Sequence, residues 1–600
     1  MIISRLFLFL LAVFFHGCLL SATSSQSTSS QSTSSQSTSS QSTSSQSTSS
    51  QSTLSQFYIV GGGITGMLQA YYALNQAEQE KKPINILIFE RNAKFSQTPA
   101  MNIFPSLTPD EILSVIPRGE TLVKNLNIPF YKGNGIKVSD VSALNMQSKT
   151  VADFVTSAIQ SAKDTSAYEE REATLLSMGK LSMSLWDELY RQADDELRAI
   201  MQAANYKPCK EVAKDEQRLG QGYRIDIFFG QPDVEAFVSH MVRKYRGLGY
   251  VSARVLDPEE TRKIDPQLTG FVEKFSIERN GERQWKKDAH AIWRPGGCLN
   301  AHVFMMGLPN YLEQRAKKMG NGSSVRLLLD HDVVGINVTE EHAVGSVNVR
   351  VNGQSIRQFP EGEQASDASL QVVLMPGEAV GTLQQLGFDE PSYAIFAGPS
   401  LRLDIPLSDS LKDKYADLDH AMEVHQDGVV LAWQAKNYSG VVTIGIAGTK
   451  AFYGDVLPKN SESFAKNRHL LQLNAAYQLY PDLINQALSR KASKGSLKQA
   501  DLDLLVQKRI ARVWVGARAV AYDGFPTLGR LYVESQPIAN VRAVTHLGSG
   551  GVSFGPAAVL MGQAITEGKD MLLESNQGLF TSVREFSDSR REASKRIRSL

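Results

Sequence analysis

Three glycines near residue 60 have the spacing at which a chain can bind a phosphate group. Gly61, Gly63 and Gly66 fit the pattern GxGxxG within FYIVGGGITGMLQAYYALNQ, residues 57–76. In this pattern the first glycine permits a tight turn, the second lets the backbone approach a pyrophosphate, and the third lets a helix and a strand pack closely. A helix that begins here presents N–H groups and a partial positive charge to the phosphates. The pattern therefore predicts a nucleotide-binding turn.

An acidic residue follows these glycines at a distance that suits a ribose. Glu90 ends the apolar stretch INILIFE and lies 24 residues after Gly66. At the end of a second strand, its carboxylate would accept hydrogen bonds from ribose hydroxyls, and its charge would repel a 2′-phosphate. We place the adjacent Arg91 with Glu90 among the predicted cofactor-binding residues. NAD and FAD both use this fingerprint, and a glycine-rich turn without a ligand is the alternative.

The residues around the glycines have the composition of a β-α-β unit. The run FYIV is apolar and rich in β-formers, as in a buried parallel strand. The residues MLQAYYALNQAEQ are typical of a helix, and INILIFE is a second apolar strand. Strand, glycines, helix, strand and acid in this order predict an α/β domain with a parallel sheet.

A second motif-rich region lies close to the end of the chain. Residues 512–531 read RVWVGARAVAYDGFPTLGRL, and NVRAVTHLGSGGVSFGPAAVLMGQAITEG follows after a short spacer. The first stretch contains G-x-R and D-G-x-P-x-x-G, formed by Gly516, Arg518, Asp523, Gly524, Pro526 and Gly529. These motifs resemble the closing signature of the FAD-dependent amine oxidoreductases, the group of D-amino-acid oxidase, glycine oxidase and sarcosine oxidase. Within that group the chain is most similar to the bacterial D-amino-acid dehydrogenase branch (small-subunit-like proteins).

This resemblance covers roughly residues 57–568 and implies a discontinuous FAD-binding domain of Rossmann-like, glutathione-reductase type. An α+β substrate domain built on an antiparallel sheet is expected to be inserted into it. Strand-like stretches far from the first strand, VRLLLDHDVVGINV and SLQVVLMPG, support this threading independently. The expected division assigns 55–124, 286–399 and 511–575 to FAD binding, 125–285 and 400–510 to the substrate domain, and 576–600 to a basic tail.

The glycine loop before the last predicted helix implies a contact with the flavin. Gly548, Gly550 and Gly551 open onto PAAVLMGQAI, so a helix N-terminus is again aimed at an anion. By resemblance, this loop stabilises negative charge at N1 and the C2 carbonyl of the flavin. Ser549, also counted as cofactor-binding, stands where the family usually has a histidine. The nearby His546 is expected to be a structural residue at a strand end.

Arg518 is the predicted catalytic residue. By resemblance, the arginine of the family motif G-x-R-P clamps the substrate carboxylate beneath the flavin, and a planar fork of donors suits that task. An ordinary ion pair, for instance with Asp523, is the alternative. Ala519 stands where the family has proline, which leaves the backbone less restrained at this point.

Together these residues predict FAD-dependent oxidation of a D-amino acid or related amine by hydride transfer to flavin N5. This chemistry needs orientation more than an acid or a base, so the lack of a Ser/His/Asp set or a carboxylate pair is no objection. Oxygen or a quinone is the expected electron acceptor. A 2-hydroxy-acid or polyol dehydrogenase on the same scaffold stays open, as does an exported protein that keeps the fold without catalysis.

Composition argues against several other classes of protein. Lys plus Arg (63) nearly equals Asp plus Glu (62), so no basic field indicates a nucleic-acid partner. Cys18, Cys209 and Cys298 have no zinc or iron–sulfur spacing, and no metal site is expected. Covalent members of the family use a cysteine near the closing motif. Since Cys209 and Cys298 lie far upstream, the FAD is expected to be non-covalent.

The first residues indicate export or membrane association. Residues 1–22 carry one arginine and then an apolar stretch of the length found in signal-peptide cores. Cleavage, lipidation at Cys18 and an uncleaved anchor are all compatible with this segment. Residues 23–54 follow, in which SSQST repeats up to Thr53. A repeat without apolar side chains cannot offset the entropy of ordering, so a flexible linker is expected.

Overall fold

The computed structural model describes the chain from Leu54 onward, with gaps. The described residues are 54–94, 106–108, 165–210, 223–230, 234–360, 370–377, 382–389, 393–426, 429–448, 451–454, 461–490, 496–521, 525–547, 551–567, 572–574 and 580–582. The predicted export segment, the repeat linker and most of the predicted basic tail lie outside these ranges. None of the helices in the described ranges combines the length and apolar composition needed to cross a lipid bilayer.

One of the two large sheets has six strands in the order β10-β2-β1-β14-β22-β21. Its strands are β1 (Ser55–Val60), β2 (Ile84–Glu90), β10 (Ser324–Leu329), β14 (Leu370–Leu374), β21 (Thr527–Val533) and β22 (Gln536–Thr545). All neighbours pair in parallel except β21, which is antiparallel to β22. Because three distant parts of the chain supply these strands, the predicted discontinuous, Rossmann-like α/β fold is confirmed.

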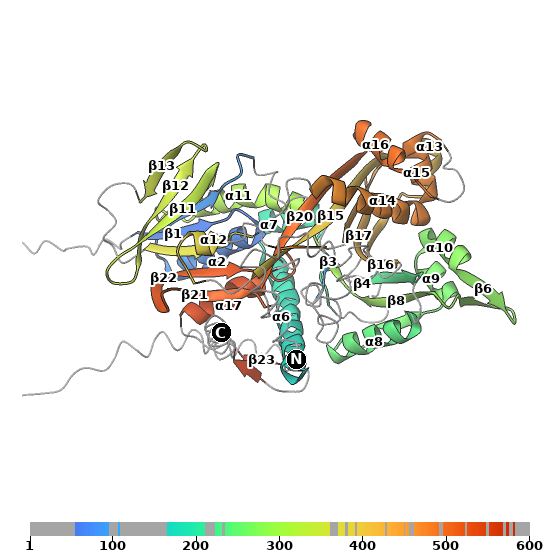
Figure 1. Ribbon diagram of the computed structural model, residues 1–600, viewed down its shortest axis with the longest axis horizontal. Helices are drawn as coiled ribbons and strands as arrows, with labels where there is room; N and C mark the ends of the chain where they lie inside the picture. Colours follow the sequence, from blue (N-terminus) through green and yellow to red (C-terminus); the bar gives the residue numbers. More distant parts are fainter. Residues whose placement is uncertain are drawn as a thin grey trace, which may run out of the picture. The chain divides into compact units, whose positions relative to one another are not determined.

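Both faces of this parallel sheet are covered, which explains its continuous apolar strands. On one face, Phe57 and Ile59 pack into a core with three helices, α2 (Ile64–Glu80), α11 (Ala301–Lys318) and α17 (Gly555–Thr566). On the other face, Tyr58 and Leu87 pack against a three-stranded antiparallel sheet of β11 (His331–Val338), β12 (Val344–Val351) and β13 (Ser355–Phe359). These elements are labelled in Figure 1.

The second large sheet has nine strands and is mainly antiparallel. Its order is β19-β15-β18-β17-β16-β4-β8-β5, with β20 paired to β15. The strands are β4 (Tyr223–Phe229), β5 (Arg254–Leu256), β8 (Ala289–Pro295), β15 (Tyr393–Pro406), β16 (Asp419–Gln426), β17 (Val429–Tyr438), β18 (Val441–Gly448), β19 (Ala451–Gly454) and β20 (Ala511–Ala521). The β16–β4 pair is parallel, and the others are antiparallel. The predicted antiparallel second sheet is therefore present.

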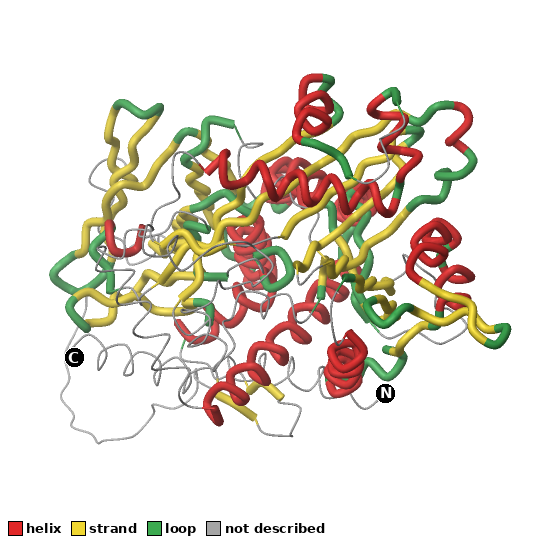
Figure 2. Tube along the Cα trace, turned by 45° about the vertical axis from the view of Figure 1, so that its right-hand side comes forward, coloured by secondary structure: helices red, strands yellow, loops and turns green. Residues whose placement is uncertain are grey.

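One face of this nine-stranded sheet is apolar and covered by helices. Leu401, Leu403 and Ile405 of β15 pack in a core with side chains from several helices. Among these helices are α9 (Pro258–Ile264), α10 (Thr269–Phe275), α14 (Ser461–Leu479), α15 (Pro481–Leu488) and α16 (Gln499–Gln507). Figure 1 shows α14, α15 and α16 against strands β15 and β20, and Figure 2 shows helices in red beside the yellow strands.

A long helix, α6 (Thr165–Gln192), lies against α17 of the parallel sheet. Leu175, Met178 and Leu185 of α6 form a small core with Phe554 and Ala557 at the start of α17. The remaining described elements are α7 (Asp195–Ala203), α8 (Val234–Gly247), α12 (Thr382–Gln385), α13 (Asp409–Lys412), η5 (Pro266–Leu268), β3 (Ser106–Leu107), β6 (Ser276–Arg279), β7 (Glu282–Trp285), β9 (Gly297–Cys298), β23 (Leu572–Glu574) and β24 (Phe580–Ser582).

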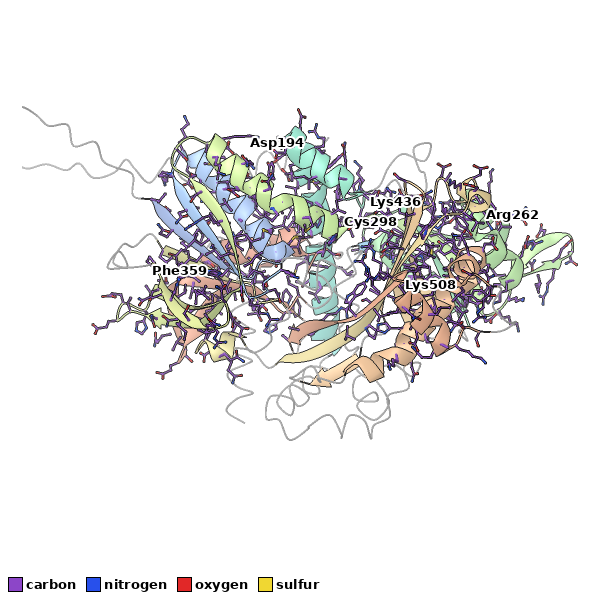
Figure 3. The ribbon with its side chains drawn as sticks, turned by 90° about the horizontal axis from the view of Figure 1, so that it is seen from above. Asp194, Arg262, Cys298, Phe359, Lys436 and Lys508 are labelled. Carbon is purple, nitrogen blue, oxygen red and sulfur yellow. The ribbon has the colours of Figure 1, made fainter. Side chains whose placement is uncertain are left out.

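The segment after α7 is tied to the nine-stranded sheet by polar contacts. Lys436 of β17 donates to the side chain of Asn205 and pairs with Asp419 of β16. The thiol of Cys298 donates to the carbonyl oxygen of Asn205 at 3.3 Å. Cys298 and Lys436 are labelled in Figure 3. Because β9 leads directly into α11, these contacts hold one connection between the two large sheets.

Candidate active site

The first glycine turn joins β1 to α2, and two of its glycines are sterically obligatory. Gly61 has φ +112°, and a Cβ on it would lie 2.1 Å from the carbonyl oxygen of Met375. A Cβ on Gly66 would lie 2.0 Å from the carbonyl oxygen of Gly61. Cβ atoms cannot approach backbone oxygens this closely, so side chains are excluded at both positions. The predicted tight turn and close helix–strand packing therefore have a direct steric basis.

Gly63 differs, because it faces open space. It is the N-cap of α2 and makes no side-chain cap hydrogen bond. A Cβ on Gly63 would have no heavy atom of the described residues within 4 Å. The first N–H groups of a helix lack intrahelical acceptors, and here no cap side chain covers them. This combination fits an anion such as a pyrophosphate lying directly against the backbone.

Glu90 lies at the end of β2, is buried, and contacts the glycine turn. Its Oε2 accepts a hydrogen bond from Gly62 N at 2.9 Å, and its Oε1 accepts from Asn92 N at 2.9 Å. The side-chain amide of Asn92 donates to the same Oε1 at 2.6 Å. A carboxylate has about four acceptor positions, so capacity remains for a ribose hydroxyl. Arg91 is exposed beside it, and the ribose role of both residues stays a prediction.

The second glycine turn joins β22 to α17, and its described part lies next to the first turn. A Cβ on Gly555, the first residue of α17, would lie 2.9 Å from Leu68 Cδ1 and 3.5 Å from Thr65 Cγ2. Both contacts are in the first turns of α2, so the N-termini of the two helices are neighbours. Gly551 is part of this turn, and a Cβ on it would meet nothing within 4 Å. Gly548, Ser549 and Gly550 lie outside the described residues.

His546 follows β22 directly, and its expected structural role stays a prediction. It is buried at the end of β22 with φ +58°. Its Nδ1 lies 2.8 Å from the hydroxyl oxygen of Thr527, the first residue of β21. This contact joins the ends of two adjacent strands beside the second glycine turn.

Strand β14 lies between the two turns and marks a reversal of the sheet order. From β1 the chain proceeds through α2 to β2 on one side, whereas β14 and β22 lie on the other side. Ligands of open α/β sheets bind outside the carboxyl ends of the strands at such a switch point. Both glycine turns follow the carboxyl ends of strands that flank β14. The two motifs that are distant in sequence are therefore brought together at the expected edge.

Arg518 is buried on β20 and its guanidinium lies over the neighbouring strand. Its residue pairs with Phe396 of β15 in the ladder. A Cβ on Gly398 would lie 2.0 Å from Arg518 Nη1, so the guanidinium occupies the space of the missing side chain. Arg518 Nη1 also donates to the carbonyl oxygen of Gly516 at 3.4 Å. The alternative partner Asp523 lies outside the described residues, so the clamp role stays a prediction.

The strand continues through Ala519 without interruption. Ala519 is buried and pairs with Ile395 in a regular ladder that extends to Ala521. Proline at this position would remove an N–H from the strand. The departure from the family pattern therefore leaves the local strand geometry regular.

Ladder register places Arg518 on the polar face of the nine-stranded sheet. Alternate residues of a strand point to opposite faces, and Leu401 and Leu403 face the helices. Ser400 and Arg402 consequently face the other side. Arg518 faces the same side, because its ladder partner Phe396 lies an even number of residues from Ser400 in β15. No heavy atom of the described residues lies within 4 Å of a Cβ added to the buried Gly516. Open space therefore adjoins the Arg518 side chain on this face.

Two buried polar side chains on the same face were not anticipated from the sequence. The hydroxyl of Ser400, 1% exposed, has no hydrogen-bond partner within the described structure. The amide of Gln434, 3% exposed, lies beside the Cys298 thiol and has no other partner among the described residues. Buried polar groups nearly always have partners, so both side chains depart from ordinary packing. A serine or glutamine within an otherwise apolar strand is the sequence feature that could have indicated these two positions.

A cluster of charged side chains lies further along the polar face. Asp226, Glu423 and His425 have ligand-type atoms within 4.8 Å of one another. However, Arg224 Nη2 contacts Glu423 at 2.9 Å and Arg224 Nε contacts Asp226 at 3.0 Å, and Arg294 pairs with both carboxylates. Both guanidiniums hold the pKa of Glu423 well below its usual range, against the effect of burial. Because two fixed cations already neutralise the carboxylates, we assign this cluster as a structural ion-pair network.

No protein-family model matches the chain, and no curated protein matches it. Among solved structures, it is similar to glycine oxidase from Bacillus cereus at 13% identity, covering 88% of this chain and 98% of that chain with a TM-score of 0.46. For L-amino acid deaminase from Proteus vulgaris, the identity is 14%, the coverage 86% and 94%, and the TM-score 0.41. For the fructosyl amine:oxygen oxidoreductase amadoriase I from Aspergillus fumigatus, the identity is 11%, the similarity covers 86% of this chain and 87% of that chain, and the TM-score is 0.42. These similarities give no residue roles, and the fold assignment above rests on strand order and register.

Proposed function

We propose that this protein is an FAD-dependent oxidoreductase that oxidises a D-amino acid or a related amine. The observation that carries the proposal is the meeting of two helix N-termini, those of α2 and α17, where the order of the parallel sheet reverses. A dinucleotide has two anionic regions to accommodate, the pyrophosphate and, for FAD, a flavin that gains negative charge on reduction. The resemblance of the closing motifs to amine oxidoreductases favours FAD over NAD.

The residues present fit the cofactor. The open space at Gly63 and the uncapped N-terminus of α2 would accept the pyrophosphate. The remaining acceptor position of Glu90 would bind a ribose hydroxyl. Gly551 and the start of α17 would lie against the flavin end. FAD bound there supplies a two-electron acceptor for a hydride from the substrate.

The chain's own contribution to the reaction would be to orient the substrate. The guanidinium of Arg518 would hold the substrate carboxylate by two parallel hydrogen bonds. A fixed carboxylate sets the direction of the Cα–H bond, and such positioning supplies a large part of the rate acceleration in reactions of this kind. A 2-hydroxy acid would use the same clamp, so the experiment must separate the two substrate classes.

The deciding experiment is anaerobic reduction of the bound cofactor by a panel of substrates. Purified full-length protein should be yellow, and its flavin absorption should bleach with D-amino acids, sarcosine or glycine. Bleaching only with lactate would replace the proposal by a hydroxy-acid dehydrogenase. Folded protein that takes up no FAD would show that the scaffold is non-catalytic. Reoxidation by oxygen or by a soluble quinone then identifies the acceptor.

We also propose that the protein is exported or membrane-associated through its first residues. The apolar stretch within residues 1–22 supports this proposal. Mass spectrometry of the protein from its native host tests it, since cleavage, a lipid on Cys18 and an intact N-terminus give three different masses. An intact, unmodified chain in the cytoplasm would contradict it.

A further inference from the structure

Helix α6 contacts the turn between β22 and α17 through two buried hydrogen bonds. The hydroxyl of Ser182 donates to the carbonyl oxygen of Ser553 at 2.6 Å. The indole N–H of Trp186 donates to the carbonyl oxygen of Val552 at 3.1 Å. Ser182 and Trp186 are almost completely buried. Two consecutive peptide groups directly after the second glycine turn are therefore held by one helix from a distant part of the sequence.

These bonds fix the direction of the peptide groups. In a trans peptide, the carbonyl oxygen and the N–H of the next residue point in opposite directions. Since the carbonyls of Val552 and Ser553 face α6, the N–H groups of Ser553 and Phe554 face away from it. Gly555 N is directed back at the carbonyl of Val552 at 3.4 Å, and Pro556 has no N–H. The orientation of the peptides at 552–554 thus determines the direction in which backbone N–H groups at the start of α17 point.

Packing alone does not require these two donors. Leu175, Met178 and Leu185 of α6 already make an apolar contact with the first residues of α17. The hydrogen bonds add a fixed orientation of the backbone, which is what electrostatic stabilisation of a developing charge needs.

We propose that Ser182 and Trp186 are positioning residues for the redox reaction. They hold the peptide N–H groups at the start of α17 in the direction that favours negative charge on the flavin. This inference rests on the proposed function, because it needs FAD at the switch point. Without the two donors, the peptides at 552–554 can rotate, and the preference for the reduced cofactor decreases.

The experiment measures the midpoint reduction potential of bound FAD in the full-length protein by equilibration with a reference dye. Ser182→Ala removes the hydroxyl, and Trp186→Phe removes the indole N–H while keeping an aromatic ring. Each variant should lower the preference for the reduced cofactor by about tenfold, which for a two-electron couple is about 30 mV. Ser184→Ala is the matched control, since that exposed hydroxyl donates to Lys180 O on the same helix at 3.2 Å. Its potential should equal that of the unmodified protein.

The outcomes separate this inference from the function on which it rests. Binding of FAD by the unmodified protein is measured first, and its failure removes the proposed function and the inference together. If FAD binds and neither variant changes the potential, the inference is wrong. Lower thermal stability with an unchanged potential would mean that α6 only supports the fold. Should Ser182→Ala be insoluble, Trp186→Phe alone decides.

Discussion

Gly63 and Gly66 are close in sequence, yet a methyl group added to each would have opposite surroundings. At Gly63 it would meet no heavy atom within 4 Å, whereas at Gly66 it would lie 2.0 Å from Gly61 O. We expect Gly63→Ala to keep the wild-type melting temperature but to bind FAD about 10- to 100-fold more weakly, because backbone–phosphate hydrogen bonds are disturbed. Gly66→Ala should lose about 1–3 kcal/mol of stability or more, because the helix must move. FAD titration and thermal unfolding measure the two effects.

Each of these two variants also serves as a control for the other. If only steric contacts within the protein mattered, Gly63→Ala would change neither the melting temperature nor the affinity for FAD. Unchanged FAD affinity in Gly63→Ala would therefore mean that the open space is not the pyrophosphate site.

Arg518 offers the clearest prediction for substrate binding. Arg518→Ala should lower kcat/KM for carboxylate substrates by about 10- to 100-fold, the value of a charge-assisted hydrogen bond of about 1.5–3 kcal/mol. The loss should appear mainly as a higher KM, while FAD remains bound. Arg518→Lys keeps the charge but not the planar fork, so its kcat/KM should be intermediate. Steady-state kinetics and the visible spectrum are the measurements, and loss of the flavin in Arg518→Ala would assign the arginine to the fold.

At the scale of elements, Gln69 in the α2–α17 interface stands out. Its side chain is fully buried, and neither amide atom has a hydrogen-bond partner within the described ranges. It lies on the face of α2 that includes Thr65 and Gln76, both of which neighbour α17. A buried polar group without a partner costs about 1–3 kcal/mol, so Gln69→Met should stabilise the protein without FAD by a similar amount. Urea unfolding of the apoprotein measures this change.

Gln472→Met is the matched control for that prediction. Gln472 is also fully buried, and its Oε1 has no partner among the described residues, but its amide nitrogen donates to the carbonyl oxygen of Pro399 at 2.8 Å. Its replacement should destabilise the protein, because a backbone acceptor loses its partner. Equal effects of the two substitutions would contradict the assignment of Gln69 as unpaired.

The elements that could be predicted from the sequence are those with local signals. The β-α-β unit around Gly61 and the closing turn before α17 have glycine spacing and apolar runs that specify strand, turn and helix within a few dozen residues. The contacts of Ser182 and Trp186 with the second turn could not be predicted, because they join residues more than 360 positions apart. The alternation of polar and apolar residues in β15 was visible, but only the ladder with β20 shows that Ser400 and Arg518 share a face.

At the scale of the whole molecule, the strand-like stretches far apart in the sequence predict that the chain passes back and forth between two sheets. The predicted domain boundaries stay predictions. The chain passes from the nine-stranded sheet to the parallel sheet between β20 and β21, within a few residues of Arg518. Thr527, at the start of β21, pairs with Thr545 at the carboxyl end of β22. The crossing therefore enters the parallel sheet at its carboxyl edge. This connection therefore joins Arg518, the predicted substrate clamp, to the edge of the parallel sheet at which the cofactor is predicted to bind.

Two buried thiols lie on two further connections between the sheets, Cys209 between α7 and β4 and Cys298 in β9. Burial raises the pKa of the Cys209 thiol and of the Cys298 thiol from 9.0 to about 11. A pKa that is higher in the folded state stabilises the protein at low pH, so this contribution is complete below about pH 9. It is lost as the pH rises toward 11, by on the order of 2 kcal/mol per thiol.

Urea unfolding between pH 8 and pH 11 tests this expectation when unmodified protein is compared with a Cys209→Ala, Cys298→Ala double variant. Buried tyrosines also titrate at high pH, but they are common to both proteins and cancel in the difference. The stability difference should shrink with rising pH, because only the unmodified chain loses the thiol contribution. A difference that stays constant across this range would mean that water reaches both thiols in the folded state.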